Sequence, residues 1–146
     1  AQGGDDASGG GVQIGGTFTM TGGTISGNST NNGGGVQVYN GTFTMEAGTI
    51  SGNSANNGGG VDVGGDSTFT KKGGTIYGDT DTSAGNGDST DNTAASGNGH
   101  AVQAGGKKRN ADADPTIKLY AKYESGVWTY NDLSSGGAGD TSGNWE

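Results

Sequence analysis

Residues 33–53 read GGGVQVYNGTFTMEAGTISGN, and this stretch is the second of three closely similar copies. The first copy, residues 9–28, reads GGGVQIGGTFTMTGGTISGN, and the third, residues 58–79, reads GGGVDVGGDSTFTKKGGTIYGD. The phenylalanines at 18, 43 and 69 mark a period of 25 and then 26 residues. Repeats of this length, built from short β-prone segments and glycine turns, are typical of a solenoid in which successive copies stack.

Within each copy, apolar side chains alternate with polar ones, as in strands that bury one face. In the first copy this alternation places Val12, Ile14, Phe18, Met20 and Ile25 on the inner face. Glycine and Asn-Gly clusters separate the strands and suit corners, because both residue types tolerate positive φ. The sequence therefore predicts an all-β fold, a right-handed parallel β-helix of about four coils with three short strands per coil.

In-register stacking predicts internal columns of like residues and a corner ladder of amides. Equivalent residues would lie about 4.8 Å apart in successive coils. The expected columns are Phe18, Phe43 and Phe69; Val12, Val36 and Val61; Ile25, Ile50 and Ile76; and, at the corner, Asn28, Asn53 and Asp79. An antiparallel meander, in which each strand pairs with its neighbour in the sequence, is the competing arrangement.

The whole chain, residues 1–146, is predicted to form a single β-solenoid domain. Its repeats are expected at about 9–32, 33–57, 58–98 and 99–132, followed by a glycine-rich tail at 133–146. An insertion at about 80–98 interrupts the third repeat, because apolar periodicity is lost there. The pattern returns as GHAVQA at residues 99–104, and the segments 115–120 and 126–130 are expected to supply the other strands of the fourth coil.

Composition and charge exclude several classes of function. Only 27% of the residues are apolar and 35 are glycine, but the regular phase of the apolar residues argues against disorder. The net charge of -8 argues against nucleic acid and anionic membrane surfaces as partners. The one basic run, Lys107 to Arg109, is interpreted as a solvated loop. No apolar stretch approaches the roughly 18 residues that a membrane span needs, so no membrane insertion is predicted.

The cycle of GGGV, TFTM and GGTISGN resembles the right-handed parallel β-helix repeats of large bacterial surface proteins, including adhesins and autotransporter-like passengers. It is also loosely similar to the repeats of polymorphic outer-membrane proteins. The likeness covers residues 9–79 and, approximately, 100–130. It implies an extracellular or bacterial cell-surface location, which the start at Ala1 rather than Met would suit as a secreted, processed chain; an excised fragment would look the same.

The favoured functional hypothesis is a secreted structural subunit of an extracellular or cell-surface fibre. The end coils would offer unpaired strand edges, so the chain is expected to join copies of itself head to tail. The expected self-association residues are Val12, Gln13 and Ile14 of one copy and Val127, Trp128 and Thr129 of the next. The alternative is an adhesin or passenger fragment that binds a host or carbohydrate ligand through its lateral faces.

Two further surfaces suggest ligands. Outward threonines resemble the Thr-x-Thr arrays of ice-binding β-solenoids, although threonine is also a common strand residue: Thr17, Thr19, Thr42, Thr44, Thr68 and Thr70. Asp79, Asp81 and Ser83 form a weak calcium candidate. A solvated acidic loop is favoured there, because Ala84 and Thr90 occupy positions where a calcium loop needs glycine and a bidentate glutamate. No metal or other cofactor is predicted.

Catalysis is not predicted. Glycoside hydrolysis needs paired carboxylates in one groove, but the outward candidates, Glu46 and Asp62, are expected on different faces. His100 is a single histidine at the start of a strand, where an ordinary surface or corner role is the favoured interpretation.

Overall fold

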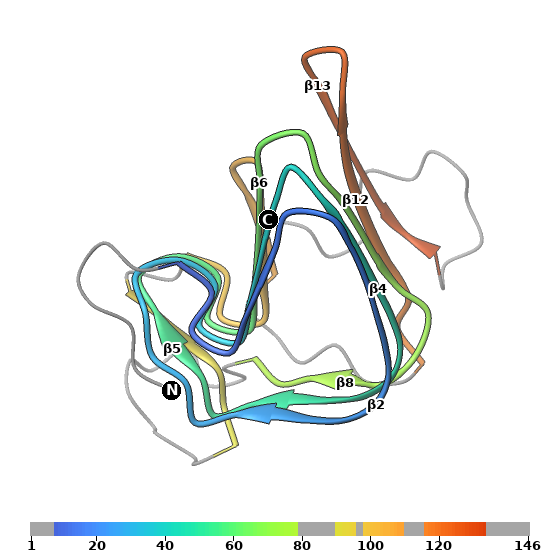
Figure 1. Ribbon diagram of the computed structural model, residues 1–146. Coiled ribbons are helices and arrows are strands. Elements are labelled where there is room, and N and C mark those ends of the chain that lie inside the picture. The colour runs from blue at the N-terminus through green and yellow to red at the C-terminus, as the bar shows by residue number, and fades with distance from the viewer. Residues whose placement is uncertain (1–7, 79–89, 96–97, 110–115, 134–146) are drawn as a thin grey trace.

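The computed structural model describes residues 8–78, 90–95, 98–109 and 116–133, and their regular structure is all-β (Figure 1). The first repeat contributes β1 (Val12–Ile14) and β2 (Thr17–Ser26). The second contributes β3 (Val36–Tyr39), β4 (Thr42–Ser51) and β5 (Ser54–Ala55). The third contributes β6 (Val61–Gly64), β7 (Thr68–Lys71) and β8 (Thr75–Ile76). The remaining strands are β9 (Thr93–Ala94), β10 (Val102–Ala104), β11 (Lys107–Arg109), β12 (Leu119–Glu124) and β13 (Val127–Asp132).

Successive repeats pair in parallel and in register, as their near-identity predicts. Val12 pairs with Val36, Val36 with Val61, and Val61 with Val102. Phe18, Phe43 and Phe69 pair in the same way in a second sheet, and their rings stack with centroids 5.8 and 5.4 Å apart. The isoleucine column at 25, 50 and 76 is also present. The antiparallel meander is therefore wrong for the three repeats.

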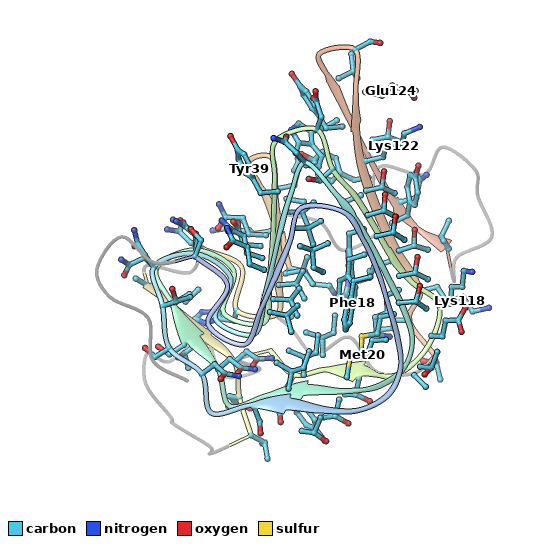
Figure 2. All side chains as sticks on the ribbon, in the orientation of Figure 1. Phe18, Met20, Tyr39, Lys118, Lys122 and Glu124 are labelled. Atoms are coloured by element: carbon cyan, nitrogen blue, oxygen red, sulfur yellow. The ribbon has the colours of Figure 1, made fainter. Side chains whose placement is uncertain are left out.

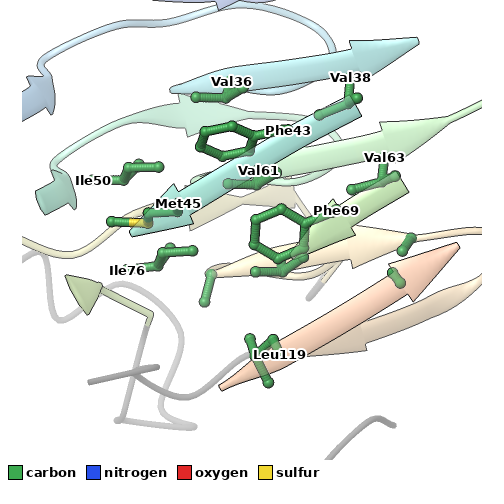
Figure 3. Packing of buried hydrophobic residues seen from close by; sticks show 14 of the residues in the cluster. Val36, Val38, Phe43, Met45, Ile50, Val61, Val63, Phe69, Ile76 and Leu119 are labelled. Carbon is green, nitrogen blue, oxygen red and sulfur yellow. The ribbon is translucent and has the colours of Figure 1, made fainter. Parts of the chain in front are cut away.

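Seen along the stack, the repeats superpose as one closed outline, and the apolar side chains fill its interior (Figures 1 and 2). Phe18 and Met20 point inward from β2 (Figure 2). The core is almost entirely Val, Ile, Phe and Met from the two main sheets, closed by Leu119 from β12 (Figure 3). Phe43, Phe69, Ile50 and Val61 are completely buried.

The strands divide each repeat differently from the prediction. β2 and β4 each run through two of the predicted strands and bend between them, where the register shifts around Thr21. The predicted Asn-Gly corner holds additional pairing: β5 pairs in parallel with β9, and Ser29 forms a bridge to Ser54. Each repeat thus has a further side where only a loop was expected.

Buried asparagines form a ladder at this corner. The Oδ1 of Asn53 accepts hydrogen bonds from the backbone N and Nδ2 of Asn28, at 3.1 and 3.0 Å. Nδ2 of Asn53 donates to Oδ1 of Asn92 at 2.9 Å. The third rung is therefore Asn92, which corrects the predicted Asp79. Asp79 itself lies outside the described residues, and the chain is back in register by Asn92 rather than at 99.

Glycine is required where the strands of neighbouring repeats approach closely. A Cβ on Gly35 would lie 2.7 Å from the carbonyl oxygen of Gly60 and 2.8 Å from Cγ2 of Ile50. Gly33 has a φ of 65°, which turns the chain into β3 in a conformation that glycine adopts without steric cost. The Gly-Gly-Gly triplet therefore encodes both the turn and the spacing of the repeats.

The fourth repeat is only partly formed. β10 continues the first sheet in parallel, with Gln103 beside Asp62, as predicted. The basic run, however, is not a loop, because Lys107 to Arg109 form β11, which pairs antiparallel with β10. β12 and β13 form an antiparallel hairpin, and β12 pairs antiparallel with β7, with Ala121 beside Phe69. The predicted parallel strands at 115–120 and 126–130 are wrong; residues 119–132 form a cap, here called the cap hairpin.

Lys71 explains why the parallel pattern stops. It occupies the position of Met20 and Met45, and its side chain is fully buried. Its Nζ donates a hydrogen bond to the carbonyl oxygen of Ile117 at 2.6 Å. A lysine in an apolar column needs such an acceptor, because a buried ammonium group without one is strongly unfavourable. This hydrogen bond holds Ile117, which lies just before the cap hairpin, against the third repeat.

Candidate functional site

β1 and β2 form one end of the stack of repeats, here called the open end. These strands lie at the outer edges of their sheets, and no other strand of the described chain pairs with their outer sides. Val12, Phe18 and Ile25 are only partly buried there, whereas Val36, Phe43 and Ile50 in the next repeat are completely buried. The open end therefore presents both unpaired backbone groups and the margin of the apolar core.

The hydrogen-bond pattern identifies the backbone groups that face outward at the open end. Val12 N donates to Gly35 O at 3.0 Å, and Thr42 N donates to Gly16 O at 2.7 Å. In a parallel sheet, the N–H and C=O groups of one residue both point to the strand on one side, and those of the next residue both point to the other side. The N–H and C=O groups of Gln13, Thr17 and Thr19 therefore point away from the stack, where another strand could pair with them.

The cap hairpin and β11 form the opposite end. The Trp128 ring stacks on Tyr130, with centroids 5.8 Å apart, and contacts Tyr123 at 5.3 Å. The Tyr130 hydroxyl donates to Gly105 O at 2.8 Å, and burial raises the pKa of Tyr130 to about 12. Trp128 thus packs over the end of the core.

The predicted self-association residues lie in different sheets. Residues 12–14 form β1 of the five-stranded sheet, whereas residues 127–129 belong to β13 of the six-stranded sheet. Stacking one copy directly on another would place β2 next to β13 and β1 next to β11. The contact predicted between Val12 and Trp128 therefore needs revision, although both segments do lie at ends of the stack.

The predicted threonine face is a regular array on the six-stranded sheet. Thr17, Thr42 and Thr68 form one in-register column, and Thr19, Thr44 and Thr70 form the other. The threonines of the first repeat are exposed and the others are half-buried. The cap hairpin ends both columns, because Tyr120 pairs with Thr70 and Lys122 with Thr68.

The carboxylates do not assemble into a catalytic or metal site in the described part of the chain. Glu46 lies on β4 beside Lys72, 3.9 Å away, whereas Asp62 lies on β6 of the other sheet. The Nδ1 of His100 accepts a hydrogen bond from Ala94 N at 3.0 Å, which gives this histidine a structural contact. Within the described ranges, no group of three His, Cys, Asp or Glu side chains could hold a metal ion. The calcium candidate Asp79, Asp81 and Ser83 lies outside those ranges.

A row of polar side chains follows the outward face of the five-stranded sheet. Gln13, Gln37, Asp62 and Gln103 are in register. Gln37 is only 6% exposed. Burial raises the pKa of Asp62 to about 6, and a hydrogen bond with Gln37 opposes this shift.

Asn92 and Lys71 were not predicted to have structural roles, although the sequence carries a signal for each. Asn92-Thr93-Ala94 matches Asn53-Ser54-Ala55, which would have placed the return to register seven residues earlier. Lys71 replaces the methionine of TFTM, and a charged residue at an inward position marks a change of environment.

Comparisons with protein-family models, with curated proteins and with solved structures found no match for this chain. The described residues contain no helix long and apolar enough to cross a membrane.

Proposed function

We propose that this chain is a right-handed parallel β-helix that serves as a structural subunit of an extracellular or cell-surface fibre. The in-register parallel pairing of three repeats supports the architecture. The right hand follows from the strong preference of parallel crossover connections for that hand. The glycine-rich, acidic sequence and its likeness to bacterial surface repeats support the location.

The open end is the single observation that carries the proposed role. β1 and β2 offer outward backbone groups beside the partly buried Val12 and Phe18. Such an edge pairs readily with another strand. In the proposed assembly, β2 of one copy pairs with β13 of the next and β1 pairs with β11. This contact joins two different surfaces, so repetition of it produces a filament rather than a closed dimer.

The geometry of the strands is compatible with that contact. β13 is antiparallel to β12, which is antiparallel to β7, so β13 runs in the same direction as β2. The tip of the cap hairpin projects sideways from the outline of the stack (Figure 1). Pairing of β13 with β2 would continue the six-stranded sheet from one copy to the next.

The substitution Thr19→Pro is expected to abolish assembly and leave the fold intact. Proline removes the outward N–H of an edge strand, and no strand of the described residues pairs with that side of β2. Thr19→Val is the matched control, because it changes the same exposed side chain and keeps the N–H. Sedimentation velocity and negative-stain microscopy should show filaments for the wild type and Thr19→Val, and monomers with an unchanged circular dichroism spectrum for Thr19→Pro. Monomeric wild type at micromolar concentration would refute the fibre role.

Ice binding is a second candidate, which the in-register threonine columns favour. Regularly spaced hydroxyl and methyl groups on a sheet can order water in a repeating pattern. We expect Thr44→Tyr, at the centre of the array, to abolish any thermal hysteresis, and Thr49→Tyr, on the same strand beyond its bend, to leave it unchanged. The absence of thermal hysteresis and of inhibition of ice recrystallisation in the wild type would remove this candidate.

A further inference from the structure

The polar row on the five-stranded sheet contains one carboxylate among amides. Gln13, Gln37 and Gln103 are the amides, and Asp62 stands between the second and the third. Amides stacked in register can donate and accept along a column, whereas an ionised carboxylate can only accept. The position of Asp62 therefore determines how far a continuous hydrogen-bond chain can run.

Between Gln13 and Asp62, the direction of the hydrogen-bond chain is fixed. Nε2 of Gln13 donates to Oε1 of Gln37 at 3.4 Å. Gln37 also makes a side-chain hydrogen bond with Asp62, in which the amide group is the donor to the carboxylate. In both hydrogen bonds the donor lies on the side of the open end and the acceptor on the side of the capped end. This run of side-chain hydrogen bonds ends at Asp62, because an ionised carboxylate has no proton to donate.

On the other side of Asp62, an acceptor lacks a donor. The Oε1 atom of Gln103 is buried and has no hydrogen-bond partner among the described residues. Its register partner on the adjacent strand is Asp62. The Oε1 atom of Gln103 is shielded from solvent, and the Asp62 side chain is half-buried. Two acceptors are thus held on neighbouring strands with poor access to solvent.

We propose that the polar row binds one proton at Asp62, whose carboxylic acid then donates to Oε1 of Gln103 and completes a continuous chain from Gln13 to Gln103. The proton provides the donor that the contact between Asp62 and Gln103 lacks. The pKa of about 6 that burial gives Asp62 agrees with this assignment. Among the described residues, the titratable groups that face the row are Tyr39 on β3 and Lys108 on β11, which pairs with Gln103. His100 lies in the turn before β10.

The consequence is a fold that is more stable in mild acid. The pKa of Asp62 is higher in the folded chain than the ordinary value of 3.8. Its contribution to stability is therefore fully present below pH 3.8 and is lost as the pH rises through about 6. The folding equilibrium constant should fall by up to about 100-fold between pH 4 and pH 7 from this group.

The test combines a titration with two substitutions. The side-chain carboxyl carbon of Asp62, followed by NMR in the intact chain, should titrate near pH 6. Gln103→Met removes the acceptor at similar volume, and it should lower that midpoint because the acid loses its partner. Asp62→Asn supplies a permanent donor. In denaturant unfolding from pH 4 to pH 7, Asp62→Asn should lack the fall in stability that the wild type shows.

Three outcomes would overturn the proposal. A midpoint for Asp62 near 3.8 would mean that the row holds no proton. A rise in the midpoint with Gln103→Met would mean that this amide donates to the carboxylate. If calcium at pH 7 shifted the Asp62 resonance and restored the stability seen at pH 4, the site would be a cation site. None of these results depends on whether the chain forms filaments.

Discussion

Replacing Asn53 with alanine is expected to lower the free energy of unfolding by about 3–5 kcal/mol. Oδ1 of Asn53 accepts from Asn28, and its Nδ2 donates to Asn92 and to the carbonyl oxygens of Ile25 and Ser51. The residue is only 1% exposed, so water cannot replace these bonds. Alanine would leave several buried groups without partners, and each carries a desolvation penalty. Urea unfolding followed by circular dichroism measures the loss.

Asn56→Ala is the control for this prediction. Asn56 is three residues away and forms a similar amide pair with Asn31, but it is exposed. Its replacement should change the free energy of unfolding by less than about 0.5 kcal/mol. Asn53→Asp tests hydrogen bonding apart from shape, since it sets a carboxylate against Oδ1 of Asn92 and should be at least as harmful as alanine. If Asn53→Ala and Asn56→Ala lowered the free energy of unfolding equally, the buried ladder would contribute no more to stability than an exposed amide pair.

Phe43→Ala is expected to cost about 3–5 kcal/mol of stability. Phe43 is completely buried and stacks between Phe18 and Phe69. Its removal leaves a cavity in the middle of the column, which neighbouring strands cannot fill because the hydrogen bonds of both sheets fix their separation. The same urea titration, extended to this variant, gives the loss directly.

Phe18→Ala provides an internal comparison, because the residue type and sequence context are nearly the same. Phe18 lies at the open end and is only partly buried, so its replacement should cost about 1–3 kcal/mol. The comparison must be made at a protein concentration at which the wild type is monomeric, since assembly would bury Phe18. If the two substitutions cost the same in monomers, another part of the chain covers the open end.

The parts of the fold that repeat were predictable from the sequence. The phenylalanines at 18, 43 and 69 indicated both the period and the register, because a parallel in-register stack places like residues side by side. The inward positions followed from alternation, and the amide ladder was predicted for Asn28 and Asn53. These features depend on local pattern, which survives in every copy.

The parts that occur once were not predictable in the same way. Residues 115–120 resemble a further TFTM strand by alternation alone, and alternation neither distinguishes parallel from antiparallel pairing nor sets the start of β12 at Leu119. The direction of β12 depends on where the chain enters, which the contact of Lys71 with Ile117 fixes. The orphan Oε1 of Gln103 and the burial of Asp62 arise from tertiary packing, and no spacing in the sequence indicates them.

Attachment of the cap hairpin to the last two repeats has a consequence for how such proteins change length. Its pairing with the stack is to β7, and Lys71, which anchors it, also belongs to the third repeat. Duplication of residues 33–57 within the gene would add one rung, about 4.8 Å, and would leave both termini of the stack as they are. The stack can therefore lengthen by one repeat at a time through recombination between copies, while the open end and the cap hairpin stay unchanged.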